Sequence, residues 1–298
     1  MAKIIDLHIH TSKSDGSFSP KEVIDMATKN NVSVLSFADH DTVSAYTPEI
    51  FDYAKNNNIT LLPAVEISTN HKGVGIHVLG YNIDLNNQNL LNTLQKLRNS
   101  RIDYLFDVSK RLNELGFEID TKSLSQLESV TKAHISSNII NNSKNTKLLF
   151  ETFGHIPSKG EFIETIMNEG CPAYVKKHTI TPLEASTLIK QAGGKSVLAH
   201  PVAYVHGDSL SESQIKELVD EMKPDGIESE YLYVDINNNL INDCKFWGDF
   251  ATKNDLFATI GSDFHTHHEI KPEIGFLNYP FMINYNLNDQ IIENLIKK

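Results

Sequence analysis

Short apolar segments alternate with amphipathic segments along the first third of the chain, and this alternation limits the possible folds more than any other feature. Residues 3–10 (KIIDLHIH) and 32–40 (VSVLSFADH) have the composition of β-strands. An amphipathic segment follows each strand and begins with proline, after Ser19 in the first case and after Thr47 in the second. Serine or threonine before proline is typical of a helix start. Strands that alternate with helices predict parallel strands with the helices packed outside.

The alternation stops in the middle of the chain. Residues 59–68 and 75–83 are predicted as the third and fourth strands. Residues 86–116 then form one long amphipathic segment with apolar side chains every three or four positions and Gly116 at its end. Residues 117–180 contain shorter, polar helical segments without convincing strand pairs. This middle region is predicted to be a mostly helical insertion.

Strands and helices alternate again after residue 180. Strands are predicted at 195–201, 226–232 and 256–265, with a helix across 237–253 and another near the C-terminus. The chain then has about seven strands, each followed by a helix or a long loop. An incomplete or distorted (β/α) barrel fits this α/β pattern best, and a doubly wound sheet is the alternative.

The predicted domain organisation follows from the interruption. Residues 1–85 and 181–298 form the α/β domain, and residues 86–180 form an inserted, mostly helical small domain. A chain of 298 residues is long enough to bury a core in each.

Composition limits the class of partner and the compartment. The net charge of −11 argues against a surface for duplex DNA, which needs clustered Lys and Arg, but it allows a small phosphorylated substrate. No apolar run is long enough to span a bilayer, and the first residues lack the apolar core of a signal peptide. With two cysteines in the whole chain, a disulfide framework is not expected, so the expected compartment is the reducing cytoplasm. No obligatory protein partner is evident.

Residue types that bind metals lie at or near the ends of six predicted strands. They are His8, His10, Asp15, His40, Glu66, His77, His200, Asp263 and His265. The ends of parallel strands in a barrel share one rim, so these side chains are expected to converge there. Each residue alone has an ordinary structural explanation, such as a core histidine or a turn aspartate. Glu66 is the exception, since a carboxylate in an apolar strand is costly unless it is paired or bound to a metal.

The predicted ligand set is rich in histidine and carboxylate and contains no thiolate. It suits Mn²⁺, Zn²⁺ or Fe²⁺ and argues against a structural zinc site of the cysteine type. One ion does not use so many ligands, so two or three divalent ions that share a bridging carboxylate are expected. Clustered divalent ions are typical of phosphate-ester hydrolysis, in which they activate water and neutralise charge on the phosphoryl oxygens.

The motifs, in order, resemble those of the PHP (polymerase and histidinol phosphatase) superfamily of metal-dependent phosphoesterases. They read DLHIHTSKSDG, FADHDTV, PAVEIS, HVLGY, LAHP and GSDFH, and the agreement extends over nearly the whole chain. The resemblance implies a distorted (β/α)₇ TIM-like barrel. Three segments of the middle region, LRNSRIDYLFDVSKRLNELGF, TKAHISSNII and GCPAYVKKHTITPLEASTLIKQAGG, are most similar to the branch of 3′,5′-nucleotide bisphosphate phosphatases and 5′-3′ exoribonucleases.

The resemblance also implies a ligand set for three ions. The first ion has the ligands His8, His10, Glu66 and Asp263. The second shares Glu66 and has His77 and His134, the latter from the insertion. The third has Asp15, His40 and His265. His200 is implied to be either a further ligand or an acid that faces the substrate, and it is grouped with Glu66 and Asp263 as catalytic.

The substrate's other phosphate needs cations, and four side chains of the middle region are candidates. These are Lys132, Arg101, Arg98 and Lys176. Relatives often have arginine where this chain has Lys132, and a lysine lacks the bidentate geometry of arginine. A solvated helix face is an equally good interpretation of Arg98 and Lys176. The other histidines are interpreted as surface residues, with His178 a candidate for the cleft: His71, His155, His178, His206, His267 and His268.

The sequence thus predicts a phosphohydrolase with a trinuclear metal site and metal-activated hydroxide. The expected substrates are 3′,5′-bisphosphonucleotides or short RNA 5′ ends. Two alternatives remain: a phosphatase for histidinol phosphate or a generic phosphomonoester, and a non-catalytic metal-binding regulatory module. A duplex DNA nuclease is disfavoured by the negative charge.

Overall fold

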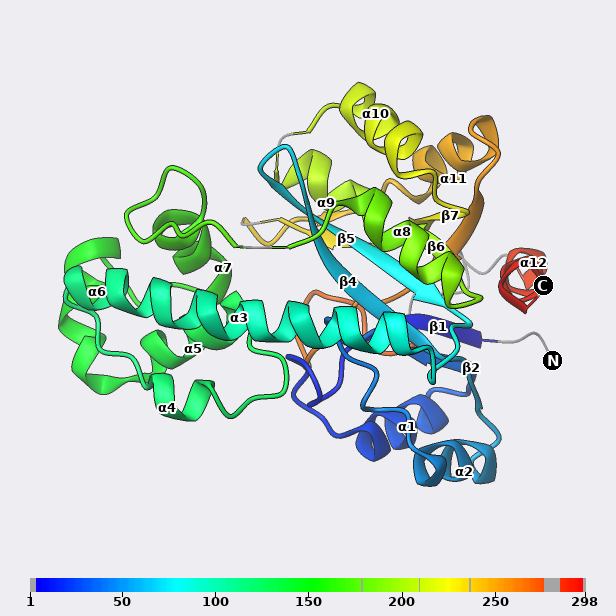
Figure 1. Ribbon diagram of the computed structural model, residues 1–298, viewed down its shortest axis with the longest axis horizontal. Helices are drawn as coiled ribbons and strands as arrows, with labels where there is room; N and C mark the ends of the chain where they lie inside the picture. Colours follow the sequence, from blue (N-terminus) through cyan, green and yellow to red (C-terminus); the bar gives the residue numbers. More distant parts are fainter. Residues whose placement is uncertain (1–3, 178, 209, 236, 276–284, 297–298) are drawn as a thin grey trace. The chain divides into compact units, whose positions relative to one another are not determined.

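The chain forms two compact units in the computed structural model (Figure 1). The described residues are 4–177, 179–208, 210–235, 237–275 and 285–296. The first unit comprises residues 1–94 and 180–298, and the second comprises residues 95–179. The long helix α3 (Gln88–Glu114) starts in the first unit, where Asn87 and Asn89 donate hydrogen bonds to Gln191. The predicted insertion at 86–180 therefore includes the first turns of a helix that belong to the first unit.

The first unit contains a three-stranded parallel sheet and a five-stranded mixed sheet. The parallel sheet has the order β1-β2-β3, with β1 (Ile4–Ile9), β2 (Val32–Phe37) and β3 (Thr60–Leu61). The mixed sheet has the order β10-β7-β6-β5-β4, with β10 (Phe257–Ile260), β7 (Gly226–Glu230), β6 (Lys195–Leu198), β5 (Val74–Tyr81) and β4 (Ala64–His71). A small hairpin of β8 (Tyr233–Val234) and β9 (Leu240–Ile241) is separate.

Single bridges, and not continuous ladders, link the two larger sheets. One bridge joins Ile9 to Phe264, and the other joins His40 to Glu66. The chain thus has a mixed α/β fold whose strand ends meet at the predicted motifs, and closure into a seven-stranded barrel stays a prediction.

Two strand pairs differ from the predicted parallel arrangement. Strand β4 pairs antiparallel with β5, and β5 pairs antiparallel with β6. The reason for the first pair is the two-residue turn Lys72–Gly73, in which both residues have positive φ, 51° and 99°. Such turns match the twist of a hairpin, but asparagine or aspartate is the usual first residue, so lysine conceals the pattern. The predicted strand at 59–68 is also divided. Its first part is β3, and its residues from Ala64 onward belong to β4.

Helices cover the first unit as the sequence predicts. Helix α1 (Pro20–Lys29) contacts β2, and α2 (Pro48–Asn56) contacts β3. The side chains of Ser19 and Thr47 cap them. Helix α8 (Pro182–Gln191) contacts β4, β5 and β6, and α11 (Cys244–Lys253) contacts β7 and β10. The remaining helices of this unit are α9 (Pro201–His206), α10 (Glu212–Met222) and α12 (Tyr285–Ile296).

The predicted helix across 237–253 is wrong in its first part, because α11 begins at Cys244. The Asp235 carboxylate accepts hydrogen bonds from the backbone N–H groups of Asn237 and Asn239, at 2.8 Å each. Local side-chain bonds of this kind compete with helix formation, and the chain turns into β9 instead.

The second unit has its own apolar core, and the regular elements among its described residues are helices. Its further elements are α4 (Thr121–Leu124), α5 (Lys132–Asn141), η1 (Ser143–Asn145), α6 (Thr146–Phe153), α7 (Lys159–Phe162) and the π-helix η2 (Ile163–Met167). One face of α3, including Leu105, Val108 and Leu112, packs with Leu149 and Phe162. Among the described residues of the whole chain, no helix has both the length and the apolar composition that a bilayer span requires.

Candidate metal centre

The end of β1 and two other segments bring four predicted ligands together in the first unit. His8 and His10 lie two residues apart, so their rings are on one side of the strand, with the Nε2 atoms 3.2 Å apart. The Asp263 Oδ1 atom is 3.5 Å from Nε2 of His8 and 3.2 Å from Nε2 of His10. Glu66 Oε1 is 3.5 Å from Nε2 of His8, and its Oε2 is 3.3 Å from Nε2 of His10. These are the four residues that the resemblance assigns to one ion.

Glu66 lies at the middle of a larger group of imidazoles. It is the third residue of β4 and not, as predicted, at the end of a strand. Its Oε1 is 3.0 Å from Nδ1 of His77 and 3.2 Å from Nε2 of His200, and its Oε2 is 2.9 Å from Nδ1 of His40. A carboxylate whose two oxygens each face several imidazoles has the arrangement of a bridging ligand.

Asp15 is the centre of the remaining group. Its Oδ1 is 3.3 Å from Nε2 of His265 and 3.6 Å from Nδ1 of His10, and its Oδ2 is 3.7 Å from Nε2 of His40. The His40 ring therefore lies between two carboxylates, with Nδ1 toward Glu66 and Nε2 toward Asp15. The resemblance grouped His40 with Asp15 and His265 alone, and the structure adds the shorter distance to Glu66.

Burial and charge act together on the pKa values of the cluster. Burial lowers the pKa of His40 to about 4, although Glu66 and Asp15 oppose this shift. Burial also disfavours the charged form of His10, but Asp263 and Glu66 outweigh it and raise that pKa to about 10. The imidazoles likewise outweigh burial and hold the pKa of Glu66 and of Asp263 well below the usual values. The carboxylates are thus ionised, as metal ligands must be.

Unpaired buried atoms show that this donor set fits cations. Within the part of the chain that the structure describes, five buried side-chain atoms of the candidate ligands have no hydrogen-bond partner: Asp15 Oδ1, His40 Nδ1, Glu66 Oε2, His77 Nδ1 and His200 Nδ1. Buried polar atoms are rarely left without a hydrogen bond. The imidazole nitrogen and carboxylate oxygen atoms of each group below lie within 4.8 Å of one another. Ligand atoms of these types suit Zn²⁺, Mn²⁺ or Fe²⁺. Among the residues that the structure describes, three overlapping groups of such atoms occur: His10, Asp15, His40 and His265; His8, His10 and Glu66; His40, Glu66 and His77.

Several carboxylates and hydroxyls support the cluster without belonging to the predicted set. Asp39 accepts hydrogen bonds from the backbone N–H and the hydroxyl of Thr11, both at 2.8 Å, and from the Ser14 hydroxyl at 2.6 Å. The Ser14 oxygen is in turn 3.3 Å from Nδ1 of His10. Tyr231 donates a hydrogen bond to Oδ2 of Asp263 at 3.1 Å. These contacts fix the loop after β1 and two of the candidate ligands.

Sequence reasoning missed Glu228, a fully buried carboxylate in β7. Its Oε1 is 3.0 Å from Nδ1 of His8. The signal was the one that identified Glu66, namely a carboxylate within an apolar strand (GIESEYL). It was overlooked because Glu228 precedes the strand end.

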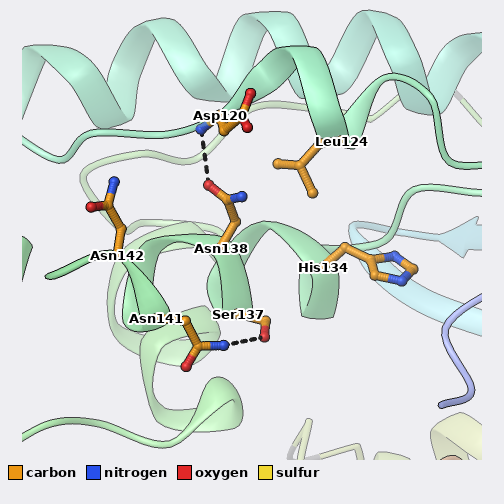
Figure 2. Close-up of a pocket in the computed structure, with 7 residues that line it drawn as sticks. All are labelled: Asp120, Leu124, His134, Ser137, Asn138, Asn141 and Asn142. Carbon is orange, nitrogen blue, oxygen red and sulfur yellow. Dashed lines mark hydrogen bonds between the residues drawn. The ribbon is translucent and has the colours of Figure 1, made fainter.

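His134 lies in the second unit, in the first turn of α5 (Figure 2). Its Nδ1 is 3.2 Å from both the backbone nitrogen and the hydroxyl of Thr131, with which it forms a capping box. It also lines a pocket formed by Asp120, Leu124, His134, Ser137, Asn138, Asn141 and Asn142. Because Nδ1 accepts the hydrogen bond from the Thr131 backbone N–H in this capping box, the proton of a neutral His134 ring is on Nε2. Coordination of a metal through Nε2 would move the proton to Nδ1, where the Thr131 hydroxyl is a nearby oxygen that could accept it.

Three of the four predicted phosphate-binding cations donate hydrogen bonds to local partners in the second unit. Arg101 is 4% exposed and donates a hydrogen bond to the carbonyl of Val130 at 3.1 Å. Lys132 donates to the side chain of Asn168 at 2.8 Å, and Arg98 donates to Gln95 at 2.7 Å. Lys176 is exposed.

Most of the other histidines lie near surface carboxylates. His155 is 2.9 Å from Glu161, His206 is 2.8 Å from Asp243, His267 is 2.9 Å from Glu273, and His71 is 3.6 Å from Glu221. The His268 ring accepts a hydrogen bond from the backbone of Ile270. His178 lies outside the described residues.

Comparison with known proteins agrees with the motif order. The family model described as PHP domain matches residues 6–237. The chain is 29% identical over 278 residues to a 5′-3′ exoribonuclease of Haemophilus influenzae, covering 89% of this chain and 91% of that protein. It is 26% identical over 275 residues to a 3′,5′-nucleoside bisphosphate phosphatase of Chromobacterium violaceum, covering 91% and 90%. A solved structure of an amidohydrolase from Chromobacterium violaceum, with bound sulfate and no metal, has a similar fold, with a TM-score of 0.75, 24% identity and coverage of 91% and 90%.

Proposed function

This chain belongs to the PHP domain family and is a phosphoesterase of that family, and we propose that its substrates are phosphorylated nucleotides. The proposed substrates are 3′,5′-bisphosphonucleotides or the 5′ ends of short RNA. The observation that carries the proposal is the position of Glu66, whose two oxygens lie 2.9–3.5 Å from imidazole nitrogens of five histidines. A buried carboxylate that is surrounded by imidazoles in this way suits the role of a ligand that bridges two ions.

The proposed centre holds three divalent ions. His8, His10, Glu66 and Asp263 would hold the first, Glu66, His77 and His134 the second, and Asp15, His40 and His265 the third. Bound ions would supply charge neutralisation at the phosphoryl oxygens and would lower the pKa of water in the site. The protein's own contribution is orientation: Tyr231 holds Asp263, and Asp39 holds the loop that carries Ser14 and Asp15.

The substrate class rests on the relatives and on charge. Two relatives with coverage near nine-tenths are named for acting on RNA or on nucleoside bisphosphates. The net charge of −11 disfavours duplex DNA and is compatible with a small anionic substrate at a cationic metal centre. We retain Lys132, Arg101, Arg98 and Lys176 as candidates for the substrate's second phosphate. Arg98, Arg101 and Lys132 would each have to exchange a protein partner for the substrate, whereas Lys176 is exposed.

A substrate panel tests this proposal. The metal-loaded protein is assayed with a 3′,5′-bisphosphonucleotide, a 5′-phosphorylated oligoribonucleotide and histidinol phosphate, with metal content measured on the same samples. We expect turnover of at least one of the first two, and loss of both turnover and metal in Glu66→Ala and Asp263→Ala. The matched control is Asp243→Asn, which removes a surface carboxylate that pairs with His206.

Different outcomes separate the alternatives. Preference for histidinol phosphate would replace the nucleotide assignment but keep the phosphatase. An inert protein that is fully loaded with Mn²⁺ would favour a regulatory metal-binding module. Unchanged turnover in Glu66→Ala despite lost metal would overturn the metal-dependent mechanism.

A further inference from the structure

Glu228 is a buried carboxylate with two partners, neither of which is a cationic side chain of lysine or arginine. Its side chain is 0% exposed and lies at the third position of β7. Its two oxygens are 3.0 Å and 3.2 Å from Nδ1 of His8, and its Oε2 accepts a hydrogen bond from the backbone N–H of His200 at 2.9 Å. Burying such a group is costly, so its placement calls for an explanation beyond packing.

The contact with His8 determines which ring nitrogen can bind a metal. A neutral imidazole has one protonated nitrogen and one free lone pair. A carboxylate next to Nδ1 keeps the proton there and leaves the lone pair on Nε2. The Nε2 atom of His8 is the one that faces Glu66 and Asp263, at 3.5 Å each.

The contact with His200 reaches a second strand end. His200 has φ of 25°, a conformation that residues other than glycine rarely adopt. Its backbone N–H donates to Glu228, and its ring Nε2 is 3.2 Å from Oε1 of Glu66. One carboxylate thus ties the ends of β1 and β6 to each other.

The packing around this pair is tight enough to require glycine. A Cβ atom at Gly261 would lie 2.2 Å from Cβ of His8 and 2.5 Å from Oε1 of Glu228. Both distances are shorter than the 3.0 Å below which Cβ atoms essentially never approach other atoms. Gly261, in the GSDFH motif, therefore leaves the space in which His8 and Glu228 meet.

We propose that Glu228 is a positioning residue that orients His8 and holds the backbone of His200, so that the metal ion at His8 binds tightly. The inference rests on the metal centre of the proposed function, and it adds a residue outside the implied ligand set. Glu228 does not touch the ion in this role, and its effect passes through His8.

Metal affinity is the first test. Metal-depleted protein is titrated with Mn²⁺ against a chromophoric chelator, for the wild type, Glu228→Gln and the control Glu230→Gln on the same strand. Loss of an outer carboxylate partner typically weakens metal binding about 10- to 100-fold, and we expect this range for Glu228→Gln. Glu230→Gln should match the wild type. Circular dichroism of the metal-free proteins checks that the variants are folded at the titration temperature.

A second measurement on the wild type does not depend on any variant. In protein loaded with Zn²⁺ and labelled with ¹⁵N-histidine, NMR should show the His8 proton on Nδ1, protected from exchange with water. Wild-type affinity in Glu228→Gln, or a His8 proton on Nε2, would overturn the inference while leaving the proposed function intact. A wild type that binds no divalent ion would overturn both the inference and the proposed function.

Discussion

The two units of this protein treat their charged side chains in opposite ways. In the first unit, buried carboxylates and imidazoles face one another. Some of their candidate ligand atoms, such as Glu66 Oε2 and His77 Nδ1, have no hydrogen-bond partner. In the second unit, buried or half-buried cations donate to local acceptors, as Arg101 does to Val130. Unsatisfied buried groups cost stability unless a ligand compensates for them, whereas satisfied ones stabilise the fold. The difference supports the proposal that the cluster of the first unit binds ions.

The largest expected effect is that of Glu66→Ala. This change removes the carboxylate that lies near the imidazoles of His8, His10, His40, His77 and His200. Metal ions supply several kcal/mol of transition-state stabilisation, so we expect turnover to fall by about 10³-fold or more, together with lost metal. Steady-state hydrolysis and elemental analysis of the same sample measure the two effects. Glu49→Gln, at an exposed carboxylate that pairs with Lys21, should change neither. If Glu66→Ala retained metal and turnover, the unpaired atoms of the first unit would not mark a metal site, and the contrast with the second unit would have no functional meaning.

The second effect concerns metal removal from the wild type. Ions that bind only the folded state stabilise it by about 2.7 kcal/mol at 100 times Kd and about 4.1 kcal/mol at 1,000 times Kd. We expect a chelator to lower the unfolding temperature and Mn²⁺ to restore it. Hydrogen exchange sharpens the comparison, because amides of β1 and β4 in the first unit should be protected by metal more than amides of α6 in the second. If the metal protected the amides of both units equally, this would contradict a site whose ligands, apart from His134, all lie in the first unit.

The regular parts of both units were predictable because local signals agree with the final packing. Ser19 and Thr47 mark helix starts, and Gly116 follows the end of α3 with φ of 94°. The antiparallel pairing of β4 with β5 was not predicted, because Lys72–Gly73 lacks the usual turn residues. Pairing direction depends on contacts between strands, and residue types alone determine it poorly.

The candidate site was predictable for a different reason. Period-two spacing places His8 and His10 on one side of a strand, and a carboxylate such as Glu66 in an apolar strand signals a buried role. Glu228 shows the limit of this reasoning. A supporting carboxylate and a direct ligand have the same appearance in a sequence, and the distances to His8 and His200 were needed to find its role.

The third effect tests whether Arg101 serves the fold or the substrate. Arg101→Ala removes a buried guanidinium and leaves the Val130 carbonyl without its hydrogen bond, so we expect a loss of about 1–3 kcal/mol of unfolding free energy. Arg98→Ala, which removes a bond to Gln95 at the helix surface, should cost less than about 0.5 kcal/mol. Urea unfolding measures both. Unchanged stability in Arg101→Ala with a raised KM for the bisphosphonucleotide would instead favour a phosphate contact.

The smallest effect compares two helix caps with the same chemistry, one in each unit. Ser19 caps α1 and Thr131 caps α5, each in a capping box, so Ser19→Ala and Thr131→Ala should each cost about 1 kcal/mol of stability. The partner of Ser19 is Glu22, which is not a candidate ligand, whereas the partner of Thr131 is His134, with its Nδ1 3.2 Å from the threonine hydroxyl. If His134 binds a metal through Nε2, the ring proton moves to Nδ1, which then gives up the hydrogen bond from the Thr131 N–H and needs the threonine hydroxyl as an acceptor. Thr131→Ala removes that acceptor, so metal affinity should fall about 10-fold in this variant alone. Thr131→Ser, which keeps the hydroxyl, should restore the affinity. Equal metal affinity in the Ser19 and Thr131 alanine variants would show that His134 is a helix cap and that the ions of the first unit do not use it.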